Sequence, residues 1–109
     1  MNESETRNYG PQRIDAIMRC WQLENHDLVE AALPEQLTHK QVQRARAGRK
    51  LTLSMMQKVT RILNEAIVSR LSAEDAEAYS PYMHRDLFSY AKNYTEEWSD
   101  PNAELYPDA

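Results

Sequence analysis

The sequence contains little of what builds disulfides, tight turns or membrane spans. Its 109 residues include one cysteine, Cys20, and two glycines. A single cysteine excludes an intrachain disulfide, and no Cys-x-x-Cys pair suggests a zinc site. No apolar run approaches the roughly 18 residues that a transmembrane helix needs, and the amino terminus carries no signal-peptide hydrophobic region. We therefore expect a cytoplasmic protein without membrane attachment. Because free cysteines are usually buried, we also expect Cys20 to be a small buried hydrophobic residue.

Catalytic signatures are missing as well. The sequence has no Gly-x-Ser-x-Gly, Walker or Rossmann pattern, and its three histidines lack the spacing of metal ligands. The tripeptide His84-Arg85-Asp86 matches part of a protein-kinase catalytic loop, but no glycine-rich phosphate loop accompanies it. We therefore expect a protein that is not an enzyme, with no catalytic residue, no metal and no cofactor.

What the sequence does contain is a helical pattern. Ala, Leu, Glu, Arg and Gln are abundant, and apolar residues recur at helical spacing over much of the chain. Asn25, Thr52 and Ser72 are suitable N-caps for three of the helices, and a further helix is predicted over residues 81–94. The sequence thus predicts an all-α fold, a compact bundle of five to six helices.

Charge is distributed unevenly along this helical chain. Residues 1–72 contain 11 Lys and Arg against 8 Asp and Glu, a net charge of +3, whereas residues 73–109 contain 2 against 9, a net charge of −7. A basic face and an acidic end are therefore compatible with nucleic-acid binding despite the overall net charge of −4. Composition and pattern together divide the chain into a flexible arm (1–10), a helical domain (11–70), a helical extension (71–95) and an acidic tail (96–109).

Residues 38–50 form the most informative stretch, because they carry five cations and no carboxylate. Thr38 can cap the start of a short helix and Gly48 its end, while Val42 and Ala45 share an apolar face. The opposite face carries Lys40, Gln43, Arg44 and Ala47. A short helix with a cationic, amide-bearing outer face suits the DNA major groove, and a solvated charged helix is the alternative.

The order of the elements around this helix resembles the phage repressor/Cro (Xre-type) helix-turn-helix family. A helix over residues 25–33 precedes it, and a glycine, basic residues and a long apolar helix follow. The residues that match the family pattern are Leu28, Thr38, Val42, Gly48, Arg49, Lys50, Thr52, Leu53, Met56, Val59 and Leu63. The resemblance covers residues 11–68 and implies a lambda-repressor-like helix-turn-helix fold, to which a carboxyl-terminal helical extension is added.

The same resemblance implies DNA-contacting roles for individual residues. The positions that contact bases in the family correspond here to His39, Lys40, Gln43 and Arg44. Phosphate contacts are implied for Asn25, His26, Thr38, Arg46, Arg49 and Lys50. Lys and Arg favour guanine O6 and N7, so a half-site that contains guanine is expected.

Aromatic residues bear on assembly, because seven of the nine lie after residue 78. They extend the core of the monomer, or they form a two-fold interface on the predicted 81–94 helix, since helix-turn-helix proteins commonly read palindromes as dimers. The residues of this candidate dimer interface are Tyr82, Met83, Leu87, Phe88, Tyr90 and Tyr94.

Two functions follow from these patterns. The first is a sequence-specific transcriptional regulator that binds double-stranded DNA, as a homodimer, through the Thr38–Ala47 helix. The alternative is a helical protein–protein interaction module, antitoxin-like or an adaptor, without DNA readout. The alternative is favoured by the −7 charge of residues 73–109 and by the long connection over residues 33–37. The acidic charge also suggests a protein partner. The clustered cations of residues 38–50 favour DNA.

Overall fold

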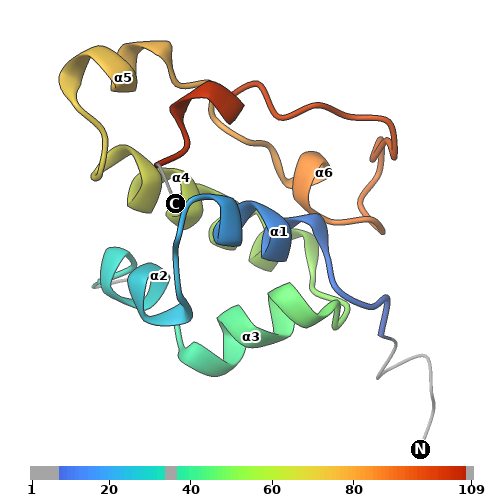
Figure 1. The fold of residues 1–109 in the computed structure, drawn as a ribbon. Helices are drawn as coiled ribbons and strands as arrows, with labels where there is room; N and C mark the ends of the chain where they lie inside the picture. Colours follow the sequence, from blue (N-terminus) through green and yellow to red (C-terminus); the bar gives the residue numbers. More distant parts are fainter. Residues whose placement is uncertain (1–7, 34–36, 108–109) are drawn as a thin grey trace, which may run out of the picture.

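The computed structural model describes residues 8–33 and 37–107 and confirms the all-α prediction (Figure 1). The helices are α1 (Arg13–Cys20), α2 (Asn25–Ala31), α3 (His39–Ala47), α4 (Leu53–Val68), α5 (Ala73–Ala78), α6 (His84–Leu87) and a short 3₁₀ helix (Ala103–Leu105). Within the described residues the only strand-like pairing is an isolated bridge between Asn8 and Arg49. No helix in this part of the chain is both long enough and apolar enough to cross a bilayer.

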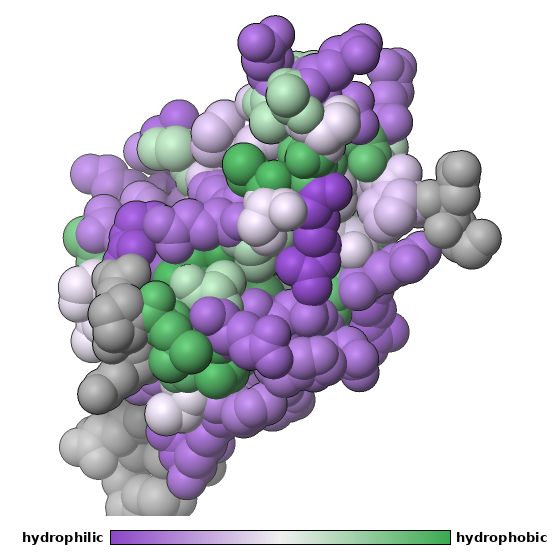
Figure 2. Space-filling view, turned by 90° about the vertical axis from the view of Figure 1, so that its left-hand side faces the viewer, coloured by the Kyte–Doolittle hydropathy of each residue, from purple (hydrophilic) through white to green (hydrophobic). Residues whose placement is uncertain are grey.

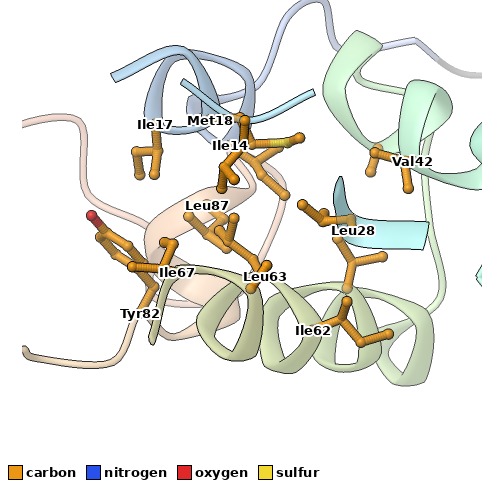
Figure 3. Close-up of a cluster of buried hydrophobic side chains, with 14 of the residues drawn as sticks. Ile14, Ile17, Met18, Leu28, Val42, Ile62, Leu63, Ile67, Tyr82 and Leu87 are labelled. Atoms are coloured by element: carbon orange, nitrogen blue, oxygen red, sulfur yellow. The ribbon is translucent and has the colours of Figure 1, made fainter. Parts of the chain in front are cut away.

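Helices α1 and α4 form the centre of the molecule. Helices α2 and α3 pack on one side of this pair. Helix α6 and the carboxyl-terminal segment that follows it (residues 88–107) lie on the other (Figure 1). The side chains between them form one hydrophobic core, with contributions from α1, α2, α3, α4 and the chain around α6 (Figure 3). Each large apolar side chain that is removed from water here stabilises the fold by roughly 1.5–3 kcal/mol.

Helix boundaries follow local capping chemistry closely. Thr38 Oγ1 accepts a hydrogen bond from the Gln41 amide at 3.1 Å, and Gln41 Oε1 accepts one from the Thr38 amide at 3.0 Å. The side chains of Thr52 and Ser72 cap α4 and α5 by accepting hydrogen bonds from the amides of Met55 and Asp75. These three predicted N-caps are confirmed. Asn25 is not a cap, because α2 begins at Asn25 and the preceding residue occupies the capping position.

The apolar stripe of α4 is confirmed except at its start. Val59, Ile62, Leu63 and Ile67 are fully buried, whereas Leu53 is 55% exposed in the first turn. On α1 the buried face is occupied by isoleucine and methionine side chains. Cys20 is therefore exposed at the end of α1, and its predicted burial is wrong.

The predicted helix over residues 81–94 is also wrong. Only His84–Leu87 are helical, and Asn93 adopts a positive φ of 70°. The backbone of this segment bonds to distant groups instead, as when the Ser89 amide donates to Gln12 Oε1 at 2.6 Å. Such long-range bonds replace helical ones, and the Phe-Ser-Tyr run at residues 88–90 has weak helix propensity.

Arg13 of α1 ties the carboxyl-terminal segment to the core. Its guanidinium lies between the rings of Tyr94 and Trp98, 4.5 and 4.7 Å from their centroids. It also donates hydrogen bonds to the carbonyl oxygens of Asp86 and Thr95, at 2.9 and 3.0 Å. The described part of the predicted acidic tail, residues 96–107, is irregular apart from the short 3₁₀ helix, and these contacts hold its start against α1.

Asp100 anchors the same segment a few residues further on. Its Oδ2 accepts hydrogen bonds from the hydroxyls of Tyr82, at 2.6 Å, and of Tyr106. Tyr82 Oη in turn accepts one from Trp21 Nε1 at 3.0 Å. Trp98, Leu105 and Tyr106 also pack against the core.

The amino-terminal residues that the structure describes are also packed against the fold. Residues 1–7 of the predicted flexible arm lie outside the described residues. The Tyr9 amide donates to the Gly48 carbonyl at 2.8 Å, and the ring of Tyr9 stacks on that of Tyr90. Residues 8–10, which the prediction placed in the arm, are therefore packed against the fold.

Candidate nucleic-acid interface

Helix α3 lies on the side of the molecule opposite the carboxyl-terminal segment (Figure 1). Val42 and Ala45 are fully buried and hold the helix on the core, as the sequence predicts. Thr38 caps its start, and Gly48 closes it in the left-handed conformation with a φ of 94°. A helix of 9 residues is marginal on its own, so packing and capping are what fix it. The outer face of α3 is therefore presented in one orientation.

The predicted base-contacting residues all lie on exposed positions of this helix. His39, Lys40, Gln43 and Arg44 are exposed, and Thr38, Arg49 and Lys50 are exposed at its two ends. The Oε1 atom of Gln43 accepts a hydrogen bond from Asn25 Nδ2 at 3.1 Å, which steadies the glutamine side chain against α2. Hydrophilic residues cover most of the face of the molecule seen in Figure 2.

Four cations of this region have no acidic partner in the part of the chain that the structure describes. No carboxylate there lies within ion-pairing distance of Lys40, Arg44, Arg49 or Lys50. The acidic carboxyl-terminal segment does not neutralise them, because it packs on the far side of α1 and α4. These four residues, called the basic face below, therefore keep their charge available to an anionic ligand.

Arg46 does not belong to the basic face. Its Nε donates to Asp15 Oδ1 of α1 at 2.7 Å, and its Nη1 donates to Asn25 Oδ1 of α2 at 2.7 Å. The Arg46 side chain is only 15% exposed. These bonds give Arg46 a structural role, because it joins α3 to the two neighbouring helices, and they do not support its predicted phosphate contact. The spacing of four residues from buried Val42 is the sequence signal that could have shown this.

Asn25 is a structural residue for the same reason. Its amide side chain bridges Arg46 and Gln43, so both its oxygen and its nitrogen already have partners. The predicted phosphate contact of Asn25 is thus not supported by its surroundings. His26, the next residue, is exposed and lies 3.4 Å from an oxygen of Asp27.

A shallow polar depression of about 410 Å³ lies where the end of α1 meets the first turns of α2 and α3. It brings His26 and His39 to one place, although they come from different helices. Arg19 also lines it, a cation that the sequence analysis did not select. Its side chain is 75% exposed and pairs with Asp15 at 3.2 Å, one helical turn away. This spacing is an ordinary surface pattern, so no sequence signal marks Arg19 as functional.

The candidate dimer interface is mostly internal. Tyr82, Leu87 and Phe88 are at most 2% exposed and belong to the core of the single chain. Tyr90 and Tyr94 are half-buried against Tyr9 and Arg13. Of the six proposed residues only Met83 is exposed, so the interface predicted on an 81–94 helix is wrong and the core alternative holds for most of these aromatics.

No group of three or more metal-ligating side chains occurs among the residues that the structure describes. Comparison with known proteins gives no match, neither to a protein-family model, nor to a curated protein, nor to a solved structure. The function proposed for the basic face therefore rests on its residues, charges and geometry.

Proposed function

We propose that this protein is a sequence-specific DNA-binding regulator of the repressor/Cro type, with α3 in the major groove. One observation carries the proposal: a capped and firmly seated helix presents cations that have no acidic partner among the described residues. An α-helix fits the major groove, where arginine and lysine can bond bidentately to guanine O6 and N7. Occupancy of the site would then exclude or recruit polymerase.

The residue roles follow from their places on α3. Lys40 in the first turn of α3 and Arg44 one turn later are both exposed and are assigned to base edges, with His39 and Gln43 beside them. Thr38, Arg49 and Lys50 flank the helix and are assigned to phosphates. Arg46 and Asn25 are removed from the predicted contacts, because both are bonded within the fold.

The distribution of charge over the whole molecule supports the same orientation. Residues 73–107 contain 2 cations and 8 carboxylates, and most of this stretch lies on the side away from α3, although Tyr90 reaches the chain that follows α3. Phosphates would repel this side and attract the basic face, so the molecule would approach the duplex with α3 first.

The proposal is tested by binding to a random-sequence duplex at about 50 mM salt, where the non-specific term is strong. We expect retention by heparin and a measurable Kd, with log K falling by roughly 2–4 per tenfold increase in salt. The double variant Arg44→Ala/Lys50→Ala should bind much more weakly. Arg85→Ala/Lys92→Ala, which removes the same charge from the acidic side, should bind as the parent does.

Absence of duplex binding by the parent at this salt would reject the proposal. The protein–protein interaction module would then be the function to pursue, with the exposed acidic segment as its contact surface. Equal losses from the two double variants would point to diffuse attraction, and would reject the assignment to α3.

We also propose that the protein is a homodimer, with an interface that differs from the one predicted. Two adjoining hollows of about 430 and 370 Å³ run along α4 beside residues 79–84 and share Asn64, Glu65 and Pro81. Exposed Val68 and Met83 lie at these hollows. They give this surface the apolar character that interface centres have.

Charge favours a second copy as the occupant of this surface. Arg61 and Glu65 lie one turn apart on the same face of α4 and pair with each other at 3.8 Å within the chain, a pairing that two copies could exchange. If α4 packs antiparallel to its two-fold mate, Arg61 of each copy approaches Glu65 of the other. A two-fold interface requires this kind of self-complementarity.

The dimer proposal is tested by sedimentation over a range of protein concentrations. The parent should dimerise, and Arg61→Glu should weaken the dimer because it places like charges opposite each other. The double reversal Arg61→Glu/Glu65→Arg should restore it. A parent that stays monomeric up to about 0.5 mM, a concentration far above a micromolar Kd, would reject the interface.

A further inference from the structure

Tyr90 joins three segments that are far apart in the sequence. Its hydroxyl accepts a hydrogen bond from the Leu51 amide at 3.0 Å and donates one to the Arg49 carbonyl at 3.2 Å. Its ring stacks on Tyr9, with 4.5 Å between centroids and 19° between planes. One side chain of the carboxyl-terminal segment thus contacts both the amino-terminal residues and the chain between α3 and α4.

That chain, residues 48–51, carries two of the four cations of the basic face. Its backbone is held at further points as well. The Arg49 amide donates to the Arg44 carbonyl at 3.0 Å, and the Gly48 carbonyl accepts from the Tyr9 amide at 2.8 Å. The side chains of Arg49 and Lys50 remain exposed, so the backbone is fixed while the charges face solvent.

The hydroxyl of Tyr90 is well placed to set this backbone, because it bonds on both sides of Lys50. The Arg49 carbonyl precedes Lys50 and the Leu51 amide follows it, so the two bonds orient both peptide groups that flank the lysine. No hydrogen bond of this kind comes from α4, whose first turn begins only at Leu53. Without the hydroxyl, these two peptide groups would lose a common partner.

We infer that Tyr90 is a positioning residue for phosphate contacts by Arg49 and Lys50. This inference rests on the proposed DNA binding and adds the carboxyl-terminal segment to the DNA-binding unit. Ordering a loop and its side chains on binding costs affinity, and a loop that is already ordered avoids part of that cost. Tyr90 supplies this order from the side of the molecule that does not face DNA.

The test is Tyr90→Phe, which removes the hydroxyl and keeps the ring that stacks on Tyr9. On a random-sequence duplex at about 50 mM salt, we expect Kd to rise about 3- to 10-fold, the loss expected when one or two side chains must be ordered on binding. The dependence of log K on log salt should also become shallower, because fewer phosphates are neutralised at once. Tyr94→Phe, in the same segment but packed on Arg13, should change neither quantity.

Two further measurements separate positioning from general destabilisation. Hydrogen exchange at the Leu51 amide should be faster in Tyr90→Phe by about tenfold or more, while core amides of α4 keep their protection. In an Arg49→Ala/Lys50→Ala background, Tyr90→Phe should have no additional effect on Kd or on the salt slope. Such non-additivity shows that the tyrosine acts through these two residues.

Each outcome has a definite meaning. If the parent does not bind duplex, the proposed function fails, and this inference fails with it. If the parent binds and Tyr90→Phe gives the same Kd and salt slope, only the role of Tyr90 is rejected. Unchanged exchange at the Leu51 amide, or a full effect of Tyr90→Phe in the Arg49→Ala/Lys50→Ala background, would reject it as well.

Discussion

At the scale of single residues, two arginines two positions apart in α3 have different surroundings. Arg44 is exposed on the outer face, whereas Arg46 bonds to Asp15 and Asn25. A helix turns by about 200° over two residues, so neighbours at this spacing face different sides. By composition both arginines belong to one basic cluster. Their helical positions relative to buried Val42 show which one faces solvent and which one faces the fold.

Arg44→Ala should therefore weaken DNA binding, whereas Arg46→Ala should lower stability. Arg44→Ala should weaken binding to a duplex selected from a random pool by about 1–3 kcal/mol and leave the melting temperature unchanged. Arg46→Ala should lower the free energy of unfolding by about 1–3 kcal/mol, because Asp15 and Asn25 lose a partner. Kd on the selected duplex and urea unfolding measure the two effects. Loss of stability in Arg44→Ala, with a stable Arg46→Ala, would contradict this assignment.

The two glycines offer a second contrast at this scale. Both have a positive φ, 79° at Gly10 and 94° at Gly48. A Cβ at Gly48 would lie 1.8 Å from the Gly10 carbonyl oxygen, whereas a Cβ at Gly10 would meet nothing within 4 Å. Gly10→Ala should cost about 1–2 kcal/mol through backbone strain alone. Gly48→Ala should cost clearly more in urea unfolding, and equal costs would show that the close approach is relieved easily.

At the scale of elements, the sequence predicts best where the determinants are local. The caps at Thr38, Thr52 and Ser72 depend on residues within one turn, and all three are found. The apolar stripe of α4 is equally local and is found except at Leu53. The predicted 81–94 helix fails because its backbone is bonded by distant groups such as Gln12. Those groups can be identified only when the tertiary fold is known.

The same limit applies to the candidate site. Exposure of His39, Lys40, Gln43 and Arg44 is predictable, because it follows from helical spacing relative to the buried face. The roles of Asn25 and Tyr90 are not, since each depends on a contact with a segment at least 18 residues away in the sequence. For Arg46 the register with Val42 indicates that the side chain turns inward, but not that Asp15 and Asn25 are its partners.

Helix α4 provides a test of its own orientation. Leu63 is fully buried and Leu53 is 55% exposed. Leu63→Ala should lower the free energy of unfolding by about 2–5 kcal/mol, because it opens a cavity in the core. Leu53→Ala, the same substitution on the same helix, should change it by no more than about 0.5 kcal/mol. Thermal unfolding of both variants is the measurement, and similar costs would mean that α4 is turned differently.

At the scale of the whole molecule, the carboxyl-terminal segment is held by side chains more than by secondary structure. Burial, above all, raises the pKa of Tyr79 and of Tyr82, and the hydrogen bond from Tyr82 to Asp100 raises the pKa of Tyr82 further. In the unfolded chain, tyrosine has a pKa of about 10. The folded chain therefore keeps the phenolic protons of Tyr79 and Tyr82 at a pH where the unfolded chain has lost them.

This difference predicts alkaline destabilisation. Below about pH 10 both states hold these protons and the free energy of unfolding is unaffected, whereas above it stability should fall by about 1.4 kcal/mol per pH unit for each tyrosine concerned. Urea unfolding followed by circular dichroism between about pH 8 and pH 11 measures the fall. Tyr82→Phe should be less stable at pH 8 but should lose less on going to pH 11. A parallel decline of the two proteins would contradict the role assigned to Tyr82.

If α3 binds DNA as proposed, the bond between Arg46 and Asp15 offers a way to alter recognition from the buried side of that helix. Asp15 belongs to α1, and its Oδ1 accepts the hydrogen bond from Arg46 Nε that links α1 to α3. Lengthening the acid, as in Asp15→Glu, would push the arginine and tilt the helix by a small amount. The preference for a base step could then change without substitution of any residue proposed to contact a base. Variants of the protein could differ in target sequence through changes in α1.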